Sequence, residues 1–129
     1  MDFMKTNRRS LVKGFTLIEI LVVVAIVGII ATIAIPQFSS YRAKSYCAAL
    51  KADLANLAIS QEAYFYDNDT YLQATLTTGG GSNVPNFSWT TGVVLVSSAG
   101  NITSWNAVVS HPNCNEGPAT WNSANTGLQ

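Results

Sequence analysis

The sequence contains few of the residue types from which catalytic and metal centres are built. It has one histidine, His111, and two cysteines, Cys47 and Cys114, in 129 residues. A single histidine leaves a serine or cysteine triad with one candidate base, and a zinc framework needs several Cys or His ligands. Zinc at Cys47, His111 and Cys114 and calcium at residues 67–69 are disfavoured, so we expect no catalytic residue, no metal and no cofactor.

Charge is also scarce, because only 11% of the residues are charged and seven basic residues balance seven acidic ones. A nucleic-acid-binding protein normally carries a basic field, so nucleic-acid binding is not predicted. The balance is uneven along the chain. Residues 1–14 have four Lys or Arg against Asp2, a net charge of +3, and residues 15–129 have three basic against six acidic residues, a net charge of −3.

A long apolar run follows this basic start. Residues 15–35 are 21 residues whose only charge is Glu19. At about 1.5 Å per residue, a helix of this length spans a hydrocarbon core of roughly 30 Å. The alternative, a buried helix of a soluble protein, is disfavoured because such helices are seldom apolar on every face. The preceding cations predict a cytoplasmic N-terminus and an exported body.

The residues at the start of this run form a recognisable motif. Residues 13–19 read K-G-F-T-L-I-E, and Pro36 follows the apolar run. Residues 8 to about 46 resemble the N-terminal signature of bacterial type IV pilins and pseudopilins. The resemblance implies that a prepilin peptidase cuts between Gly14 and Phe15 and that the new amino group of Phe15 is methylated. The alternative is that Gly14 is only a loop residue before an uncleaved anchor.

The resemblance also implies an α+β pilin fold with four segments. Residues 1–14 would be the cleaved leader, residues 15–36 the transmembrane and polymerisation helix, and residues 37–66 its amphipathic continuation. Residues 67–129 would form a β-rich head, periplasmic or extracellular, with an antiparallel sheet of three or four strands packed on the helix. Pairs of β-rich runs predict strands at residues 87–98 and 102–110, joined by a turn at residues 99–101, and a third strand at residues 119–122.

Three residues of the apolar helix call for an explanation. A carboxylate in hydrocarbon costs about 2.5 to 3.5 kcal/mol at the bilayer centre and less near the interface. The resemblance implies that Glu19 pairs with the Phe15 amine of a neighbouring subunit during assembly; the alternative is that it reaches the lipid headgroups. Gly28 and Pro36 are expected to interrupt the helix, either as a static kink or by local loss of helix in a filament.

Beyond Pro36 the helix is expected to reach about Tyr64 with two apolar faces. We assign the face of bulky residues to the chain's own sheet and the face of small residues to helices of other subunits, although helix propensity alone also explains the alanines. The bulky face comprises Cys47, Leu50, Leu54, Leu57 and Tyr64. The small face comprises Ala48, Ala49, Ala52, Ala55, Ile59 and Ala63.

The two cysteines are expected to form a disulfide, because the head is exported to an oxidising compartment and each has only the other as a partner. The bridge would tie the helix at Cys47 to the C-terminal segment at Cys114. In the commonest pattern of the family both cysteines lie near the C-terminus, so an adhesive loop of that type is in doubt here.

These features predict a structural subunit of a type IV pilus and not an enzyme. It would form a homo-oligomeric helical filament serving attachment, twitching motility or DNA uptake. The expected partners are the inner membrane before assembly, the prepilin peptidase and methylase, and the pilus assembly machinery. The chain would lie in the inner membrane with its head in the periplasm and then in an extracellular pilus. The alternative is a pseudopilin of a type II secretion system.

Overall fold

The structure is a computed structural model that describes residues 14–125 and 127–129. The expected leader before Gly14 therefore lies outside the described residues. The contacts divide the chain into two compact units, Met1–Gln37 and Phe38–Gln129, which are treated separately below. We call the second unit the head.

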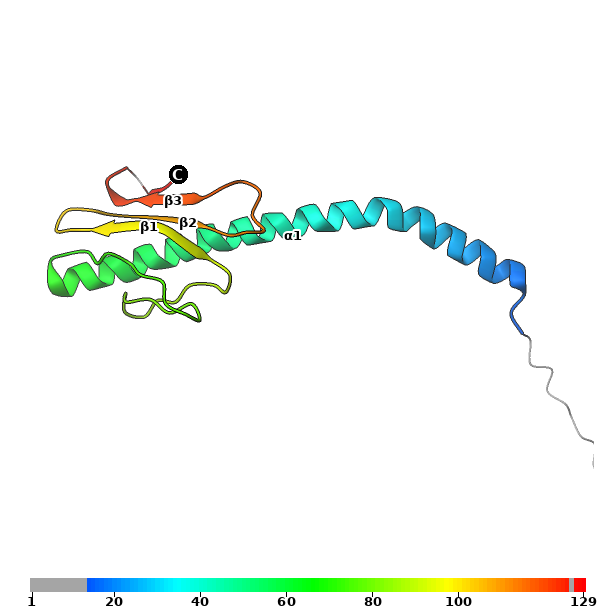
Figure 1. Ribbon diagram of the computed structural model, residues 1–129, viewed down its shortest axis with the longest axis horizontal. Helices are drawn as coiled ribbons and strands as arrows, with labels where there is room; N and C mark the ends of the chain where they lie inside the picture. Colours follow the sequence, from blue (N-terminus) through cyan, green and yellow to red (C-terminus); the bar gives the residue numbers. More distant parts are fainter. Residues whose placement is uncertain (1–13, 126) are drawn as a thin grey trace, which may run out of the picture. The chain divides into compact units, whose positions relative to one another are not determined.

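One helix, α1 (Leu17–Asn68), contributes to both units (Figure 1). It ends four residues beyond the predicted end at Tyr64. The next residue, Asp69, has a φ of 54° and donates its backbone N–H to the Phe65 carbonyl oxygen at 2.8 Å. This left-handed residue closes the last turn in the manner common at helix ends.

The helix is continuous through Gly28 and Pro36, so neither residue ends α1 in this structure. Pro36 has no N–H to donate, and an interior proline typically costs a helix about 3 kcal/mol. The many other backbone hydrogen bonds of a 52-residue helix offset such a cost. The two alternatives, a static kink at Pro36 in every state and a local loss of helix in a filament, both stay predictions.

Four antiparallel strands form one sheet in the order β1-β2-β3-β4, which confirms the predicted α+β fold (Figure 1). Their bounds are β1 Val94–Gly100, β2 Trp105–Ser110, β3 Ala119–Asn122 and β4 Gly127–Leu128. The prediction for β3 is confirmed, and β4 brings the sheet to the upper of the two expected strand numbers. Each strand lies beside its neighbour in the sequence, so the sheet is a simple meander.

The predicted bounds of the first two strands were wrong at their N-terminal ends. The first begins at Val94 and not at residue 87, because Val93 donates its N–H to the Thr90 carbonyl and Gly92 has a φ of 90°, which together form a turn. The second begins at Trp105, because the Asn101 side-chain oxygen accepts from the backbone N–H of Thr103 and of Ser104. These local bonds replace strand pairing.

The core of the head lies between α1 and the sheet. Leu50, Leu54 and Leu57 have no exposed surface, and Cys47 is also buried, so the predicted bulky face is confirmed at these four positions. Tyr64 is only half-buried. The sheet contributes the inward-facing side chains of β2, which alternate along the strand as Trp105, Ala107 and Val109.

Candidate functional site

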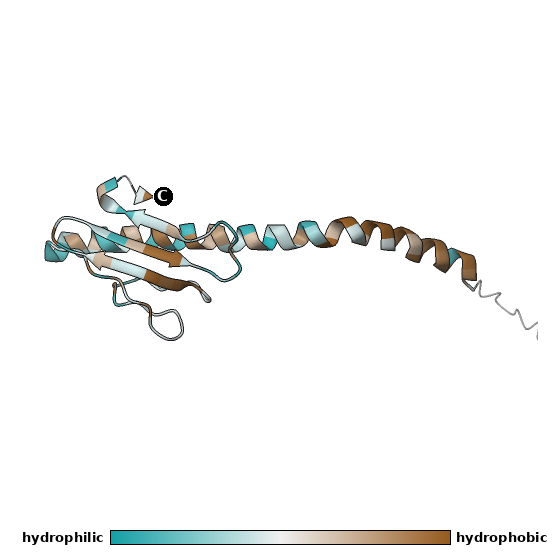
Figure 2. Ribbon diagram, turned by 45° about the horizontal axis from the view of Figure 1, so that its top comes forward, coloured by the Kyte–Doolittle hydropathy of each residue, from teal (hydrophilic) through white to brown (hydrophobic). Residues whose placement is uncertain are grey.

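The N-terminal part of α1 presents apolar side chains to its surroundings on every side. Leu17 is 82% exposed and Ile33 68% exposed, and none of the most apolar 18-residue window of α1 is buried. In Figure 2 the ribbon of this part of the helix has mostly the brown colour of hydrophobic residues. By length and composition, α1 is a helix that could cross a membrane. An apolar surface of this extent marks a site that lipid or protein covers.

Glu19, the charge inside this run, closes the first turn of the helix. Its Oε2 atom accepts from the Thr16 backbone N–H and from the Thr16 hydroxyl, each at 3.2 Å. The Glu19 N–H donates in return to the Thr16 Oγ1 atom at 3.3 Å. This reciprocal pair is a capping box, which satisfies N–H groups that the helix itself leaves unpaired. Sequence reasoning missed this role, although the Thr-x-x-Glu spacing indicates it.

The two glycines of this unit are not required by contacts within the chain. A Cβ atom built on Gly14 or on Gly28 would meet no heavy atom within 4 Å. Gly14 and Phe15, the two residues of the expected cleavage site, are both exposed. The described part of the chain therefore gives no packing reason for a glycine at either position.

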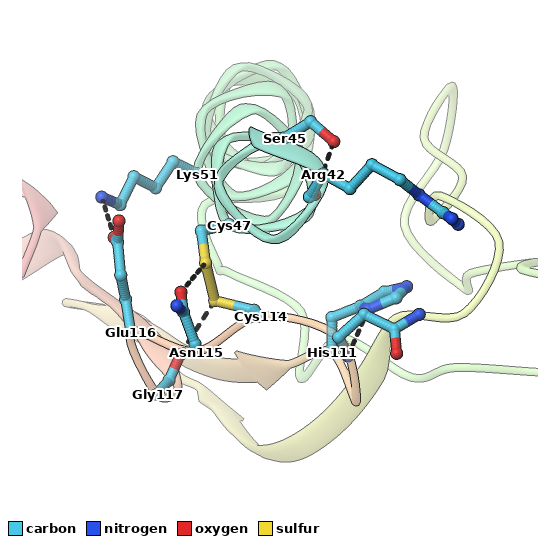
Figure 3. Close-up of a disulfide and its surroundings, with 10 residues drawn as sticks. Arg42, Ser45, Cys47, Lys51, His111, Cys114, Asn115, Glu116 and Gly117 are labelled. Carbon is cyan, nitrogen blue, oxygen red and sulfur yellow. Dashed lines mark hydrogen bonds and ion pairs between the residues drawn. A yellow bond between two sulfur atoms is a disulfide. The ribbon is translucent and has the colours of Figure 1, made fainter. Parts of the chain in front are cut away.

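A disulfide joins Cys47 of α1 to Cys114, in the segment between β2 and β3, with the two Cα atoms 5.0 Å apart (Figure 3). The predicted pairing is confirmed. Beside it, the Lys51 amine and a Glu116 carboxylate oxygen lie 2.9 Å apart, also across α1 and this segment. Both side chains of that pair are half exposed, so it contributes about 0 to 1 kcal/mol. The covalent bond is the main link here.

The histidine beside the disulfide serves packing. The His111 ring stacks on the Tyr46 ring with 4.3 Å between the ring centroids, and its Nδ1 atom accepts from the Asn113 N–H at 3.1 Å. Arg42 donates to the Tyr46 hydroxyl at 3.3 Å. That hydrogen bond and the positive charge of Arg42 lower the pKa of Tyr46.

Two buried polar side chains were missed by sequence reasoning. Asp53 is buried and accepts from the Thr90 N–H and the Thr90 hydroxyl, each at 2.8 Å. Gln61 has no exposed surface; its amide donates to the Leu72 carbonyl at 2.6 Å and accepts from the Leu72 N–H at 3.0 Å. Both bind loop backbone to α1, and nothing in their local sequence indicates the distant partner.

Within residues 14–125 and 127–129, no three His, Cys, Asp or Glu side chains are grouped so that they could hold a metal ion. The sulfur atoms of Cys47 and Cys114 are bonded to each other, so they are not available as thiolate ligands.

The structure thus has a long apolar helix that begins with a capping box, followed by a disulfide-bonded α+β head. The family model of the prokaryotic N-terminal methylation motif matches residues 9–35 of the chain. This range contains Gly14, Phe15, Glu19 and Gly28. It therefore includes the expected cleavage site and the exposed apolar part of α1 up to residue 35.

Named relatives make the class more specific. The chain is 46% identical over 59 residues to the type IV major pilin protein PilA of Myxococcus xanthus, covering 46% of this chain and 27% of that protein. It is 44% identical over 59 residues to a type IV major fimbrial protein FimA of Dichelobacter nodosus, covering 46% and 38%. A type IV major alpha-pilin of Moraxella bovis is 40% identical over 58 residues, covering 45% and 36%.

The chain spans about a quarter to two fifths of the length of these relatives. Over the part that the comparisons cover, the chain is similar to these type IV pilins, and its head has the helix-on-sheet fold that this similarity predicts.

Proposed function

We propose that the chain is a structural subunit of a type IV pilus, which polymerises through the apolar part of α1 into a surface filament. The observation that carries this proposal is the complete exposure of that helix on a chain whose head has its own core. A helix that is apolar on all sides is unstable in water and requires lipid or other helices around it. A bilayer meets the need before assembly and a bundle of such helices meets it afterwards.

In this proposal the chain is first held in the inner membrane with its N-terminus in the cytoplasm and its head in the periplasm. A prepilin peptidase then cuts the exposed Gly14–Phe15 bond, and the Phe15 amine is methylated. The match of residues 9–35 to the methylation motif supports both steps. The open space around Gly14 supports a bond that a peptidase reaches without displacing other groups.

Glu19 is proposed to pair with the Phe15 amine of a neighbouring subunit in the filament. In the single chain its carboxylate is occupied by Thr16 through two hydrogen bonds. Both bonds lie at the exposed start of the helix, so the carboxylate can exchange them for a cationic partner at small cost. An opposite charge is the stronger partner once lipid or protein excludes water.

Mass spectrometry of filaments sheared from cells tests the proposal. We expect the subunit to begin at N-methylated Phe15 and its head to carry no free thiol before reduction. Filaments composed of a chain that retains Met1, or a sheared fraction without this subunit, would contradict the proposal. The quoted relatives are named pilin or fimbrial proteins, so the pseudopilin alternative is not favoured.

A further inference from the structure

A groove of about 250 Å³ opens directly on the disulfide of the head, and both bonded cysteines line it. Leu50 and Ala119, which are buried, give it apolar walls. Lys51 and Glu116, which are half exposed, also line it, and Figure 3 shows this ion pair on one side of the disulfide. The groove is therefore a place where an external molecule can reach a sulfur atom of the chain.

The two sulfur atoms differ in their access to the solvent. Cys47 is only 2% exposed and is the first buried residue of α1. Cys114 is partly exposed, and every other residue from 112 to 118 in its loop is exposed. A Cβ atom built on Gly117 would meet no heavy atom within 4 Å, and the Gly117 carbonyl oxygen lies 3.6 Å from the Cys114 Sγ atom. Open space therefore adjoins the Cys114 side of the disulfide.

This difference in access determines how the bond can react. In thiol–disulfide exchange, a thiolate attacks one sulfur of a disulfide and forms a mixed disulfide, and the rate depends on which sulfur the reagent reaches. A buried cysteine is inert and an exposed one reactive. The accessible sulfur of this pair is that of Cys114, so an external partner is expected to become bonded to Cys114 and not to Cys47.

We propose that the head exchanges disulfides with an external thiol–disulfide oxidoreductase through Cys114, with Cys47 as the resolving cysteine. The groove receives the segment of this partner that flanks its reactive cysteine. The disulfide in the groove wall identifies this occupant, because the partner's sulfur must come within bonding distance of Cys114. Leu50 and Ala119 then provide apolar contacts for the adjoining peptide.

Two exchange steps form the bridge in this scheme. The Cys114 thiolate attacks one sulfur of the partner's disulfide, so that a mixed disulfide forms and the partner's second sulfur leaves as a thiolate. The Cys47 thiolate then attacks the Cys114 sulfur, which closes the bridge and expels the partner's first sulfur as a thiolate. The two cysteines of the chain are oxidised and the partner's disulfide is reduced to a dithiol. The two protons lost by the chain's thiols are taken up by the partner's thiolates.

The second step is intramolecular, and the folded head favours it by holding the two Cα atoms 5.0 Å apart. The inference goes beyond the proposed function and depends on it only for the export of the head to the compartment of the partner. Its tests use the purified full chain in detergent micelles. They therefore succeed or fail independently of whether the chain forms filaments.

The oxidised wild-type chain tests which sulfur is attacked. Reduced glutathione is the probe, N-ethylmaleimide quenches the reaction and blocks free thiols, and mass spectrometry of peptides locates both groups. We expect glutathione on Cys114 with N-ethylmaleimide on Cys47, in at least about tenfold excess over the reverse arrangement. Equal amounts of the two products, or an excess of glutathione on Cys47, overturn the inference.

A matched pair of variants tests the step with an oxidoreductase. The probe is a purified oxidoreductase with an oxidised Cys-x-x-Cys motif. Cys47→Ser keeps the accessible thiol and lacks the resolving one, so it should accumulate the mixed disulfide at least about tenfold faster than Cys114→Ser. Both variants lack the bridge, and in concentrated urea their rates should converge to within about threefold because both thiols are then exposed.

Equal rates for two variants whose tryptophan fluorescence shows a folded head would contradict the proposed order of the two cysteines. A tenfold difference that persists in urea would also contradict it, because the fold would not be its cause. If neither variant folds, the wild-type measurement with glutathione decides.

A bulky substitution tests whether the partner uses the groove. Glu116→Trp places a large ring in the groove wall and should slow oxidation of the reduced chain by the same oxidoreductase at least about tenfold. Asn56→Trp is the matched control, because it places the same ring on an exposed position of α1 outside this groove. Its rate should stay within about threefold of the wild-type rate. An unchanged rate for Glu116→Trp would overturn the assignment of the groove to the partner.

Discussion

The N-terminal helix and the head use apolar side chains in opposite ways. In the helix, the Leu, Ile and Val side chains of residues 17–35 are exposed on every side, and the chain's own contacts satisfy only polar groups, as at Thr16 and Glu19. In the head, Leu50, Leu54 and Leu57 lie wholly inside a core that α1 and the sheet close together.

The difference shows which region of the chain can bury its apolar side chains within one copy. The head has a core, a disulfide and buried polar clamps, so one copy is sufficient to complete it. The N-terminal part of α1 has its backbone hydrogen bonds, but no other segment of the described chain covers its side chains. The chain therefore combines a head that buries its own core with an apolar helix whose side chains need lipid or other helices around them.

The largest expected effect comes from replacing Glu19, the one charged residue among residues 15–35. We expect Glu19→Ala to keep membrane insertion but to abolish filaments, because an unpaired Phe15 amine buried in the polymer costs about 3 to 5 kcal/mol. Electron microscopy and the sheared fraction measure the yield. Thr16→Ala is the control: it removes the hydroxyl of the capping box and keeps the carboxylate. It should cost about 0.5 to 2 kcal/mol of helix stability and still allow filaments; abundant pili from Glu19→Ala would refute this reading.

The next effect is confined to the head. Replacing Cys47 and Cys114 together by Ser opens a loop with a sequence separation of 67 residues, and chain entropy predicts a loss of about 4 kcal/mol in the free energy of unfolding. Urea denaturation of residues 38–129, followed by tryptophan fluorescence, measures it. Lys51→Gln removes the neighbouring surface ion pair and should cost less than about 1 kcal/mol. Equal losses for both variants would show that the bridge is not the main link.

The two faces of the head portion of α1 provide a third test. Leu54→Ala opens a cavity under the sheet and should destabilise the head by about 2 to 5 kcal/mol, seen as a lower Tm. Ala52 is exposed on the small-residue face, so Ala52→Trp should leave the Tm unchanged. It should instead lower the filament yield, because overpacking costs about 1 to 3 kcal/mol at each contact. A head that melts equally early in both variants would mean that the faces are assigned wrongly.

The smallest expected effect is a difference between the pKa values of two tyrosines of the head, Tyr46 and Tyr71. The pKa of Tyr71 is raised above 10.0 by partial burial and by the hydrogen bond and charge of Glu62, whereas Arg42 lowers the pKa of Tyr46. With rising pH the unfolded chain loses the Tyr71 proton first, so the contribution of Tyr71 to stability is present below pH 10 and is lost as pH rises through its raised pKa. The contribution of Tyr46 has the opposite sign and is present above pH 10.

An NMR titration of the two tyrosine rings in the head measures both shifts. Tyr46 should ionise before Tyr71. Arg42→Gln should move the Tyr46 titration upward and leave that of Tyr71 in place, and Glu62→Gln should move the Tyr71 titration downward. Coincident titrations of the two rings would contradict the opposite pKa shifts of Tyr46 and Tyr71.

The sequence predicts those parts of the fold that depend on local patterns. The apolar run and the buried face at Leu50, Leu54 and Leu57 follow from periodicity, and the disulfide follows from two cysteines in an exported head. The burial of Asp53 does not follow from a local pattern, because its partner, Thr90, is 37 residues away. β4 contains only two residues, too few to show any alternation. In each case the missing information is a tertiary contact.

The position of the disulfide also limits how far the chain can lengthen under load. A pull transmitted along α1 passes from Cys47, the first buried residue of the helix, to Cys114, and the Cα atoms of the two residues are 5.0 Å apart. If the packing of the head gave way without the bridge, the chain from Cys47 to Cys114, a sequence separation of 67, could extend to roughly 230 Å. With the bridge intact, that segment adds no length to a chain pulled through these two residues, so the crosslink makes the head an inextensible joint.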